Sequence, residues 1–265
     1  MEIKRVRLFV NENEKSKEVE NSISDKFTNN GFIITNENDF DLGIAIGGDG
    51  SFLRMVNDSS FKSDCLYVGI NVGTLGFAQD ISVDELDDLI EEIKTNNFFY
   101  EQIGIQSIEV IYDNNSSSNF NCLNEIVVRH EELKVLHMDL YVDDVLFEKF
   151  AGDGVLISTS FGSSAYNLSY GGSLVYNEFD TLQITPIAPI KNQVYHTIAN
   201  SLILPANKNI KLSFDVDNKI LIMVDGRNLL FENINEIKTS IDRHINVFRK
   251  YNYNYIKKIN DKLIK

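Results

Sequence analysis

The sequence predicts an α/β domain with a parallel sheet, followed by a β-rich domain whose antiparallel strands form a sandwich-like structure. Two observations support this prediction. In residues 1–98, short apolar runs alternate with helical patterns, which is the rhythm of βαβ units and a parallel sheet. In residues 99–251, strand-like runs follow one another with turn residues between them. The change of pattern near Phe98 is therefore the expected domain boundary.

The elements of the first half follow from local signals. Gly31 is placed to end a helix that begins at Glu14. The segment Ser82-Val83-Asp84-Glu85 is a capping box, in which the Ser and Glu side chains satisfy the first N–H groups of a helix. The expected strands are Val6–Val10, Phe32–Thr35, Leu42–Ile46 and Leu66–Ile70, and the expected helices are Glu14–Asn30, Ser51–Asn57 and Ser82–Asn97.

The second half is expected to consist almost entirely of strands. Turn residues such as Asp113-Asn114-Asn115 and Val142-Asp143-Asp144 separate the runs. One helix is expected around Ser163–Tyr170, and a final amphipathic helix at Tyr255–Ile264. The expected strands are Ile103–Tyr112, Glu125–Arg129, Met138–Val142, Val155–Ser158, Asn209–Phe214, Ile220–Val224 and His244–Phe248.

The composition is that of an acidic globular protein. The chain has 265 residues, of which 43% are hydrophobic, and its formal net charge is −14. A chain of this length buries a core without disulfide or metal staples. The negative charge and the lack of basic clusters argue against a nucleic-acid partner. A small anion such as a phosphate must therefore be bound by backbone N–H groups, a helix N-terminus or a metal.

Further features predict a cytoplasmic protein without a membrane partner. Cys65 and Cys122 lie far apart and form no CxxC pair, which is typical of reduced thiols. The charged N-terminus lacks the apolar core of a signal peptide. No apolar run approaches the roughly 18 residues that a membrane span needs.

The strongest local motif is Gly47-Gly48-Asp49-Gly50-Ser51, between an apolar strand and a helix. Glycines let the backbone turn sharply and approach a ligand, and the helix N-terminus offers unpaired N–H groups to an anion. A carboxylate there would repel a phosphate unless Asp49 binds Mg²⁺ or accepts a proton from an attacking hydroxyl. The alternative is a tight turn in which Asp49 caps the helix.

Two further loops follow predicted strands. The first is the glycine-rich segment Gly69–Phe77. Because the C-terminal ends of parallel strands share the sheet edge at which ligands bind, this loop is a candidate part of a ligand site. The alternative for it is an ordinary connecting loop. The segment Asp153–Asn167 contains a Ser/Thr/Gly-rich turn that suits a neutral polar group, with Tyr166 as a flat apolar wall. Upstream, Asn124-Glu125 can hold a ribose diol, although such a dipeptide is common.

Several other motifs are excluded. Gly47–Arg54 lacks the Lys-Ser/Thr of a P-loop, and no glycine cluster fits G-x-G-x-x-G. Gly162–Tyr166 lacks the closing glycine of a nucleophile elbow. In His130–Lys134 a lysine stands where a zincin has its second histidine. The histidines are scattered, so we expect no metal site formed by the protein alone.

Taken in order, these motifs resemble those of bacterial NAD kinases. The resemblance rests on Gly47-Gly48-Asp49-Gly50, Gly69–Phe77, Asn124-Glu125 and Asp153–Tyr166, and it covers roughly residues 42–200. It implies an N-terminal α/β domain, a β-rich domain over residues 99–251, and a C-terminal segment, residues 252–265, that returns to the first domain.

The resemblance also implies the reaction. NAD kinases use ATP and Mg²⁺ to phosphorylate the 2′-hydroxyl of the adenosine ribose of NAD, which gives NADP. Whether polyphosphate replaces ATP, and whether NADH is also accepted, stays open. Family members form homodimers or homotetramers, and a neighbouring subunit can contribute to the dinucleotide pocket.

The site residues that the resemblance implies fall into three groups. The catalytic residue is Asp49, whose counterpart lies near the reacting hydroxyl. The phosphate-binding and ATP-binding residues are Gly47, Gly48, Gly50 and Ser51. The NAD-binding residues are Phe77, Asn124, Glu125, Asp153, Ser164, Ala165, Tyr166, Ile190 and Tyr195, of which Ile190 and Tyr195 fall in the segment that a neighbouring subunit can contribute.

The sequence departs from the family pattern at three positions. Ser51 stands where the family usually has Thr, which keeps the hydroxyl. Ser160 replaces a proline, which removes a restriction on φ. Phe161 replaces a small hydroxyl residue and so loses one hydrogen bond, which puts Phe161 in doubt as a ligand contact.

Two other functions fit parts of the pattern. A lipid kinase can share the Gly-Gly-Asp-Gly element, but the net charge of −14 argues against a membrane-facing surface. A non-catalytic NAD(P) sensor would keep the pocket, and the intact Asp49 argues against this alternative.

Overall fold

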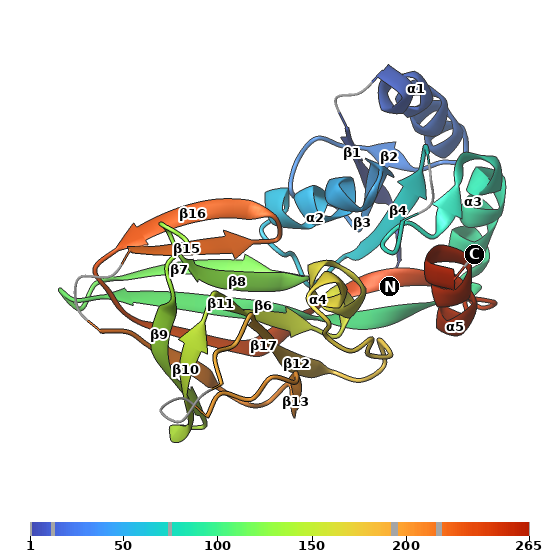
Figure 1. Cartoon of the computed structure of the whole chain (residues 1–265). Helices are drawn as coiled ribbons and strands as arrows, with labels where there is room; N and C mark the ends of the chain where they lie inside the picture. Colours follow the sequence, from blue (N-terminus) through green and yellow to red (C-terminus); the bar gives the residue numbers. More distant parts are fainter. Residues whose placement is uncertain (1, 12–13, 74–75, 192–195, 216–218, 265) are drawn as a thin grey trace. The chain divides into compact units, whose positions relative to one another are not determined.

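Two long strands, β6 (Phe98–Tyr112) and β17 (Ile234–Lys250), contribute residues to both of the units into which the chain divides (Figure 1). Unit 1 comprises residues 1–103 and 245–265, and unit 2 comprises residues 104–244. The computed structural model describes the chain apart from residues 1, 12–13, 74–75, 192–195, 216–218 and 265. No helix in the described part of the chain is both long and apolar enough to span a membrane.

Unit 1 contains a parallel sheet with the strand order β17-β4-β3-β1-β2. All six residues of β3 and of β4 are buried, as expected for central strands of a parallel sheet. The prediction of an N-terminal parallel sheet is therefore confirmed. The strands are β1 (Arg5–Val10), β2 (Ile33–Ile34), β3 (Leu42–Gly47), β4 (Leu66–Asn71) and the short β5 (Ile81–Ser82), which pairs with β4.

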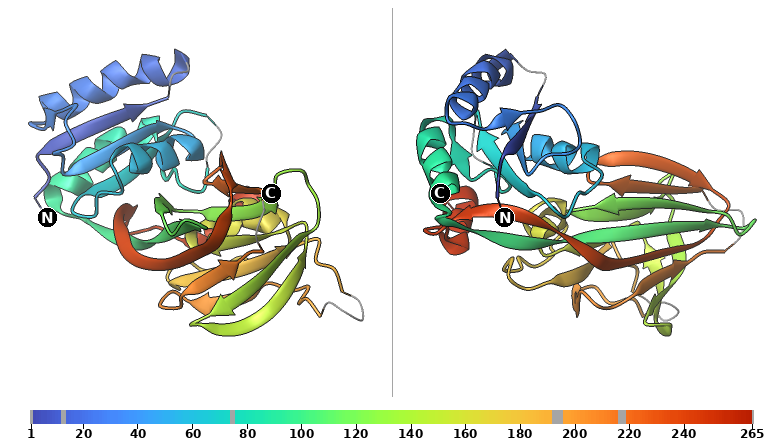
Figure 2. Two further views of the ribbon diagram at one scale, coloured as in Figure 1. Left: turned by 90° about the vertical axis from the view of Figure 1, so that its left-hand side faces the viewer. Right: turned by 180° about the vertical axis from the view of Figure 1, so that it is seen from behind.

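Helices cover both faces of this sheet because successive side chains of a strand point to opposite faces (Figure 2). Leu42, Ile44 and Ile46 belong to a core that includes side chains of α1 (Glu14–Asn29) and α3 (Leu86–Thr95). On the other face, a Cβ at Gly43 would lie 3.3 Å from Met55 of α2 (Asp49–Asp58), so α2 packs closely there.

The predicted helix signals of unit 1 are present. The capping box is formed, since Glu85 accepts a hydrogen bond from the Ser82 backbone N–H at 2.9 Å. A 3₁₀ turn (Val83–Glu85) then leads into α3. Gly31 follows α1 with φ +90°, the left-handed conformation that glycine favours after a helix.

Unit 2 is made of antiparallel strands. One sheet has the order β13-β12-β11-β8-β15-β16, and in the other β10, β9, β14 and β17 are neighbours in that order, with β6 pairing β17 and β7. The strands are β7 (Ser117–Cys122), β8 (Glu125–His130), β9 (Leu136–Val142), β10 (Val145–Gly152), β11 (Gly154–Thr159), β12 (Thr181–Ile187), β13 (Leu202–Pro205), β14 (Ile210–Ser213), β15 (Lys219–Val224) and β16 (Arg227–Glu232).

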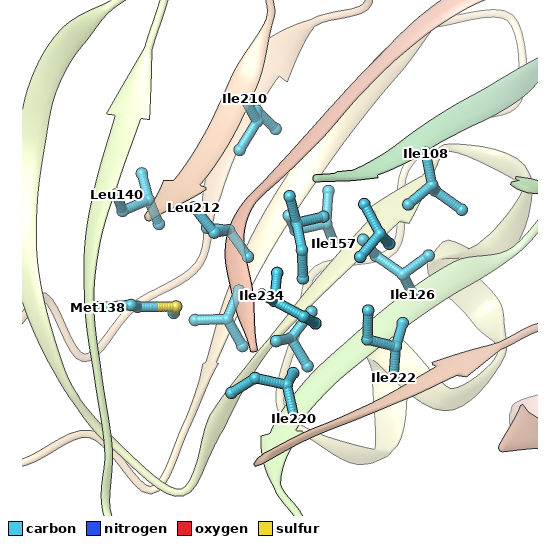
Figure 3. Packing of buried hydrophobic residues seen from close by; sticks show 14 of the residues in the cluster. Ile108, Ile126, Met138, Leu140, Ile157, Ile210, Leu212, Ile220, Ile222 and Ile234 are labelled. Carbon is cyan, nitrogen blue, oxygen red and sulfur yellow. The ribbon is translucent and has the colours of Figure 1, made fainter. Parts of the chain in front are cut away.

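The core of unit 2 lies between these two sheets. Ile126, Ile157 and Ile222 come from one sheet, and Leu140 and Leu212 come from the other (Figure 3). All five are at most 1% exposed. The predicted antiparallel, sandwich-like second domain is confirmed.

Several predicted elements differ in the structure. The predicted helix around Ser163–Tyr170 is a 3₁₀ turn (Phe161–Ser164) followed by the short α4 (Tyr166–Ser169), because Ala165 has the non-helical angles φ −90°, ψ −132°. The predicted final helix is α5 (Tyr255–Ile259), which continues as a π-helical segment (Asn260–Ile264). The predicted strand His244–Phe248 is only the end of the much longer β17.

Strands β5, β7, β10, β12, β13 and β16 were not predicted. In β12 the reason is that polar side chains are buried. Gln183 and Thr185 are at most 2% exposed, and they form hydrogen bonds with Ser173 and Asn167. These polar side chains interrupt the apolar pattern by which a buried strand is recognised.

Candidate functional site

The Gly-Gly-Asp-Gly motif lies where β3 ends and α2 begins, in unit 1. Gly47 has φ +148°, and a Cβ there would lie 2.3 Å from the Ser51 hydroxyl oxygen, so both conformation and space require glycine. The backbone N–H groups of Ser51 and Phe52 donate to the Gly48 carbonyl at 2.8 and 3.3 Å. The N–H groups that precede these first helical bonds have no acceptor within the helix, which makes this end of α2 suited to an anion.

The carboxylate of Asp49 binds the second glycine-rich loop and does not cap its own helix. Its two oxygens accept hydrogen bonds from the backbone N–H groups of Phe77 and Ala78, both at 2.8 Å. The Gln79 side-chain amide donates to the Gly48 carbonyl at 2.7 Å. The two loops that were predicted to share one sheet edge are thus joined directly. Thr74 and Leu75, in the middle of the second loop, lie outside the described residues.

Asp49 can still act on a ligand. A carboxylate has about four lone-pair sites, and the two N–H groups use one on each oxygen. Among the described residues no group of three or more acidic, histidine or cysteine side chains could hold a metal ion. Mg²⁺ is commonly held by one or two carboxylates together with substrate phosphates, and Asp49 fits such a role.

In unit 2, the turn after β11 packs directly on Asn124, the residue before β8. A Cβ at Gly162 would lie 2.2 Å from the Asn124 carbonyl oxygen. The same oxygen accepts hydrogen bonds from the Thr159 backbone N–H at 2.9 Å and from the Ser158 hydroxyl at 3.2 Å. The structure therefore brings together two segments that the sequence singled out separately.

Tyr166 lies beside Glu125 at this place. The Tyr166 backbone N–H donates a hydrogen bond to the Glu125 carboxyl group. Its ring is 38% exposed and packs edge-on against Tyr170, with 4.7 Å between the ring centroids. Ser164 and Ala165 are half-buried next to it. These residues form one polar surface with a flat aromatic side.

The Glu125 side chain is 4% exposed. Burial, reinforced by the nearby charge of Asp225, raises the pKa of Glu125 to about 8. Its Oε2 atom is buried without a hydrogen-bond partner in the described part of the chain. Buried polar atoms are usually paired, so this oxygen is available to a bound polar group.

Asp225 is a site residue that the sequence analysis missed. It lies in the turn between β15 and β16, with φ +45°, followed by Gly226 with φ +79°. Its carboxylate accepts hydrogen bonds from the backbone N–H groups of Leu123 and Asn124 at 2.9 and 2.8 Å. The available sequence signal was the Asp-Gly pair between two strand-like runs. This signal predicts a hairpin turn, but it does not indicate that the Asp225 side chain is buried.

Asp153 and Ile190 lie close to one another at the start of β11. Asp153 is exposed just before β11, and its N–H donates to the Ile187 carbonyl at 3.0 Å. The Ile190 N–H donates to the nearby Ala151 carbonyl at 2.7 Å. Tyr170, whose hydroxyl is 2.8 Å from that of Tyr166, contacts Arg129, and Arg129 lies against Gly154, the residue after Asp153. Tyr195 lies outside the described residues.

Two family models cover most of the chain. The ATP-NAD kinase N-terminal domain matches residues 4–98, and the ATP-NAD kinase C-terminal domain matches residues 123–241. The NAD kinase of Finegoldia magna is 38% identical over 253 residues, which is 92% of this chain and 92% of the relative. The NAD kinase of Streptococcus gordonii is 32% identical over 242 residues, which is 91% of this chain and 88% of the relative.

Solved structures share the fold. Yeast NADH kinase complexed with NADH has a TM-score of 0.85 at 20% identity, covering 99% of this chain and 88% of that chain. An NAD kinase from Archaeoglobus fulgidus in complex with ATP has a TM-score of 0.71 at 20% identity, covering 93% and 94%. These comparisons support neither the lipid kinase nor the sensor. The chain therefore belongs to the NAD kinase family, whose members are phosphotransferases with an alcohol group as acceptor.

Proposed function

We propose that this chain transfers the γ-phosphoryl group of ATP to the 2′-hydroxyl of the adenosine ribose of NAD, giving NADP and ADP. The observation that carries the proposal is the position of Asp49. Its carboxylate stands at the N-terminus of α2, and two backbone N–H groups fix its orientation. A carboxylate held in this way beside an anion site suits phosphoryl transfer to a hydroxyl.

The phosphates of ATP are held by the loop Gly47–Ser51. The backbone N–H groups before the first turn of α2 and the positive end of the helix dipole attract the anion. Glycines at 47, 48 and 50 let the backbone approach the phosphates closely. An acidic protein with a net charge of −14 depends on such backbone donors.

Asp49 orients the 2′-hydroxyl and accepts its proton. The ribose oxygen forms a bond to the γ-phosphorus, the bond from that phosphorus to the bridging oxygen of ADP breaks, and the proton of the hydroxyl passes to the carboxylate. The hydrogen bonds from Phe77 and Ala78 hold the carboxylate in a fixed position, which favours a reactive arrangement of the groups.

NAD is bound by the surface around Asn124, Glu125 and Tyr166 in unit 2, with Ser164 and Ala165 beside them. Phe77, whose backbone N–H holds Asp49, is a further proposed NAD-binding residue. Asn124 and Glu125 hold a ribose and the base, and the unpaired Glu125 oxygen accepts a hydroxyl. The proposed assembly is a homodimer or homotetramer in which Ile190 and Tyr195 act on the NAD of a neighbouring copy, and the exposed Asp153 lies beside Ile190.

Mg²⁺ accompanies ATP and neutralises the charge of the phosphates. Asp49 and the phosphate oxygens of ATP would hold it, since the described residues offer no cluster that could hold a metal without a substrate. The cytoplasm is the proposed compartment. Cys65 and Cys122 are both free and buried, as thiols in a reducing compartment are.

The test is NADP formation from NAD, ATP and Mg²⁺, measured with an NADP-specific dehydrogenase. We expect Asp49→Asn to lower kcat by roughly 10²- to 10⁴-fold, the usual size of a lost general base. Asp58→Asn is the matched control, because Asp58 is an exposed carboxylate at the other end of the same helix. Activity of Asp49→Asn within about threefold of wild type would exclude the assigned role. NAD binding without any NADP formation would favour the sensor instead.

Parallel assays with polyphosphate in place of ATP, and with NADH in place of NAD, identify the donor and the acceptor. If only the pair ATP and NAD gives product, the enzyme is specific for one donor and one acceptor.

A further inference from the structure

The C-terminal segment of unit 1 begins at the sheet edge that carries Asp49. Strand β17 pairs in parallel with β4, in the register Asn246 with Leu66 and Val247 with Tyr67. Parallel strands end at the same edge of a sheet, and ligands bind at this edge. Because β17 ends at Lys250, residues 251–264 start beside the loops that follow β3 and β4.

This segment is fastened to the loop that holds Asp49. Arg249 is 1% exposed, donates to Glu101 at 2.9 and 2.7 Å and forms an ion pair with Asp80. Lys258 of α5 forms a second ion pair with Asp80. Asp80 follows Gln79, whose side chain is hydrogen-bonded to Gly48. The C-terminal helix therefore has a defined position relative to the Gly-Gly-Asp-Gly motif.

A pocket of about 180 Å³ opens against the C-terminal helix, and its charged lining residues are Lys250, Lys257, Lys258, Lys262, Asp80, Glu85 and Asp261. Lys250 is paired with Glu85 at 2.9 Å, and Lys258 is paired with Asp80. Lys262 is half-buried, and within the described residues no ion pair is found for it. Asp80 is already paired with Lys258 and Glu85 with Lys250, and Asp261 acts on Lys262 through its charge.

Lys262 also lies within electrostatic reach of Asp49. Burial lowers the pKa of the Lys262 ammonium, and the charges of Asp49 and Asp261 oppose this effect. A P-loop carries its phosphate-binding lysine next to its glycines, and Gly47–Arg54 has none.

We propose that Lys262 binds the terminal phosphates of the phosphoryl donor and so supplies, from the C-terminal helix, the cation that the glycine-rich loop lacks. The inference rests on the proposed phosphotransferase function and adds a residue to it. The ligand class is a chain of phosphoanhydride-linked phosphates, which both ATP and inorganic polyphosphate provide. The ammonium would neutralise charge on the phosphate and would make no contact with NAD.

The test separates donor binding from acceptor binding. We expect Lys262→Met to raise the KM for ATP about 10- to 100-fold, the size expected for a lost charge-assisted hydrogen bond, while the KM for NAD stays within about twofold. Lys262→Arg should restore most of the affinity for ATP, because it keeps the charge. Lys17→Met is the control, since Lys17 is an exposed lysine of α1 and its loss changes the net charge equally.

Several outcomes would overturn the inference. One is a KM for ATP within about twofold of wild type in Lys262→Met. Another is an equal rise in both KM values together with a lower unfolding temperature, which indicates a structural role. If the KM for polyphosphate rises as the KM for ATP does, Lys262 binds the phosphate chain whichever donor carries it. If only the KM for ATP rises, Lys262 binds a phosphate of the nucleotide. Both results support the site.

If wild-type protein forms no NADP, the proposed function fails and the phosphate site is judged by binding alone. Calorimetry then measures the binding of inorganic tripolyphosphate to wild type, Lys262→Met and Lys17→Met. Binding that Lys262→Met loses and Lys17→Met keeps supports the site, whereas equal or absent binding in all three proteins contradicts it.

Discussion

A Cβ atom on Gly76 would lie 1.9 Å from Oδ1 of Asp49, so the backbone of the second loop is in direct contact with the Asp49 carboxylate. All three heavy atoms of that carboxyl group lie within 2.6 Å of the Cβ position. Such distances are far below any real contact, and only glycine allows the Phe77 and Ala78 N–H groups to reach Asp49.

Gly76→Ala should therefore displace Asp49. We expect kcat to fall about 10²-fold, since a displacement of about 1 Å can have this effect. The matched control is Gly73→Ala in the same loop, because a Cβ at Gly73 would meet nothing within 4 Å. Steady-state kinetics of the two variants measure the difference. Equal activity of both variants would show that the contact is unimportant.

Glu125 should make the stability of the ligand-free protein fall as the pH rises. Burial raises its pKa from 4.5 to about 8, so between these values the folded state keeps a proton that the unfolded state releases. The free energy of unfolding therefore decreases from about pH 4.5 to pH 8. Glu125→Gln should remove this decrease and be more stable than wild type above pH 8, by an amount on the order of 5 kcal/mol, since one pKa unit corresponds to about 1.36 kcal/mol.

Urea unfolding at pH 5, 7 and 9 measures the effect. Glu232→Gln is the control, because Glu232 is an exposed carboxylate in β16. Curves of stability against pH that stay parallel for wild type and Glu125→Gln would contradict the prediction.

Asp225→Asn should weaken NAD binding through Asn124 and Glu125. An asparagine has one acceptor oxygen where Asp225 uses two, so the N–H of Leu123 or Asn124 loses its partner. We expect a loss of about 1–3 kcal/mol in the free energy of unfolding, from the unpaired buried N–H. The KM for NAD should rise while the KM for ATP is unchanged.

A second effect distinguishes this role from a general loss of stability. Because the Asp225 charge raises the pKa of Glu125, the variant should show a weaker dependence of stability on pH between 4.5 and 8. Asp144→Asn is the control, since Asp144 lies in the equivalent turn between β9 and β10 with its side chain 92% exposed. An unchanged pH dependence in Asp225→Asn would exclude the electrostatic link.

Arg249→Met should destabilise unit 1 strongly. Asp80 and Glu101 hold the pKa of the buried Arg249 above its usual value, although burial opposes the charge. Removing the guanidinium leaves Glu101 without this partner, and breaking a buried ion pair in this way costs about 3–5 kcal/mol. Thermal unfolding measures the loss, with Arg243→Met, 46% exposed, as the control. A change below about 1 kcal/mol would contradict the prediction.

The sequence was sufficient for the features that depend on side-chain pattern. The continuous apolar runs of β3 and β4 and the capping box at Ser82 predicted the parallel sheet and α3, because those patterns follow from burial and from helix ends. The glycine-rich loops were also readable, since few other residues permit the close approach seen at Gly76.

Features that depend on the backbone or on long-range contacts were not predictable. Phe77 and Ala78 bind Asp49 through N–H groups that almost every residue possesses, so no residue type signals the contact. Asp225 looked like an ordinary turn residue, because its hydrogen-bond partners Leu123 and Asn124 lie more than 100 positions away in the sequence. The interruption at Ala165 is a matter of backbone angles alone.

The return of β17 to the first sheet has a consequence for synthesis on the ribosome. Residues 104–244 form a contiguous unit that can fold as soon as it leaves the ribosome. Unit 1, in contrast, is complete only when residues 245–265, which include the end of β17, have been added to the first 103 residues. Glu101 meets Arg249 only after a further 148 residues have been added, which takes roughly 7–30 s at bacterial rates of chain elongation. During that interval β5 covers only the C-terminal end of this edge of β4, and the part that pairs with β17 is open. Nascent chains should therefore depend on chaperones until the final strand is in place.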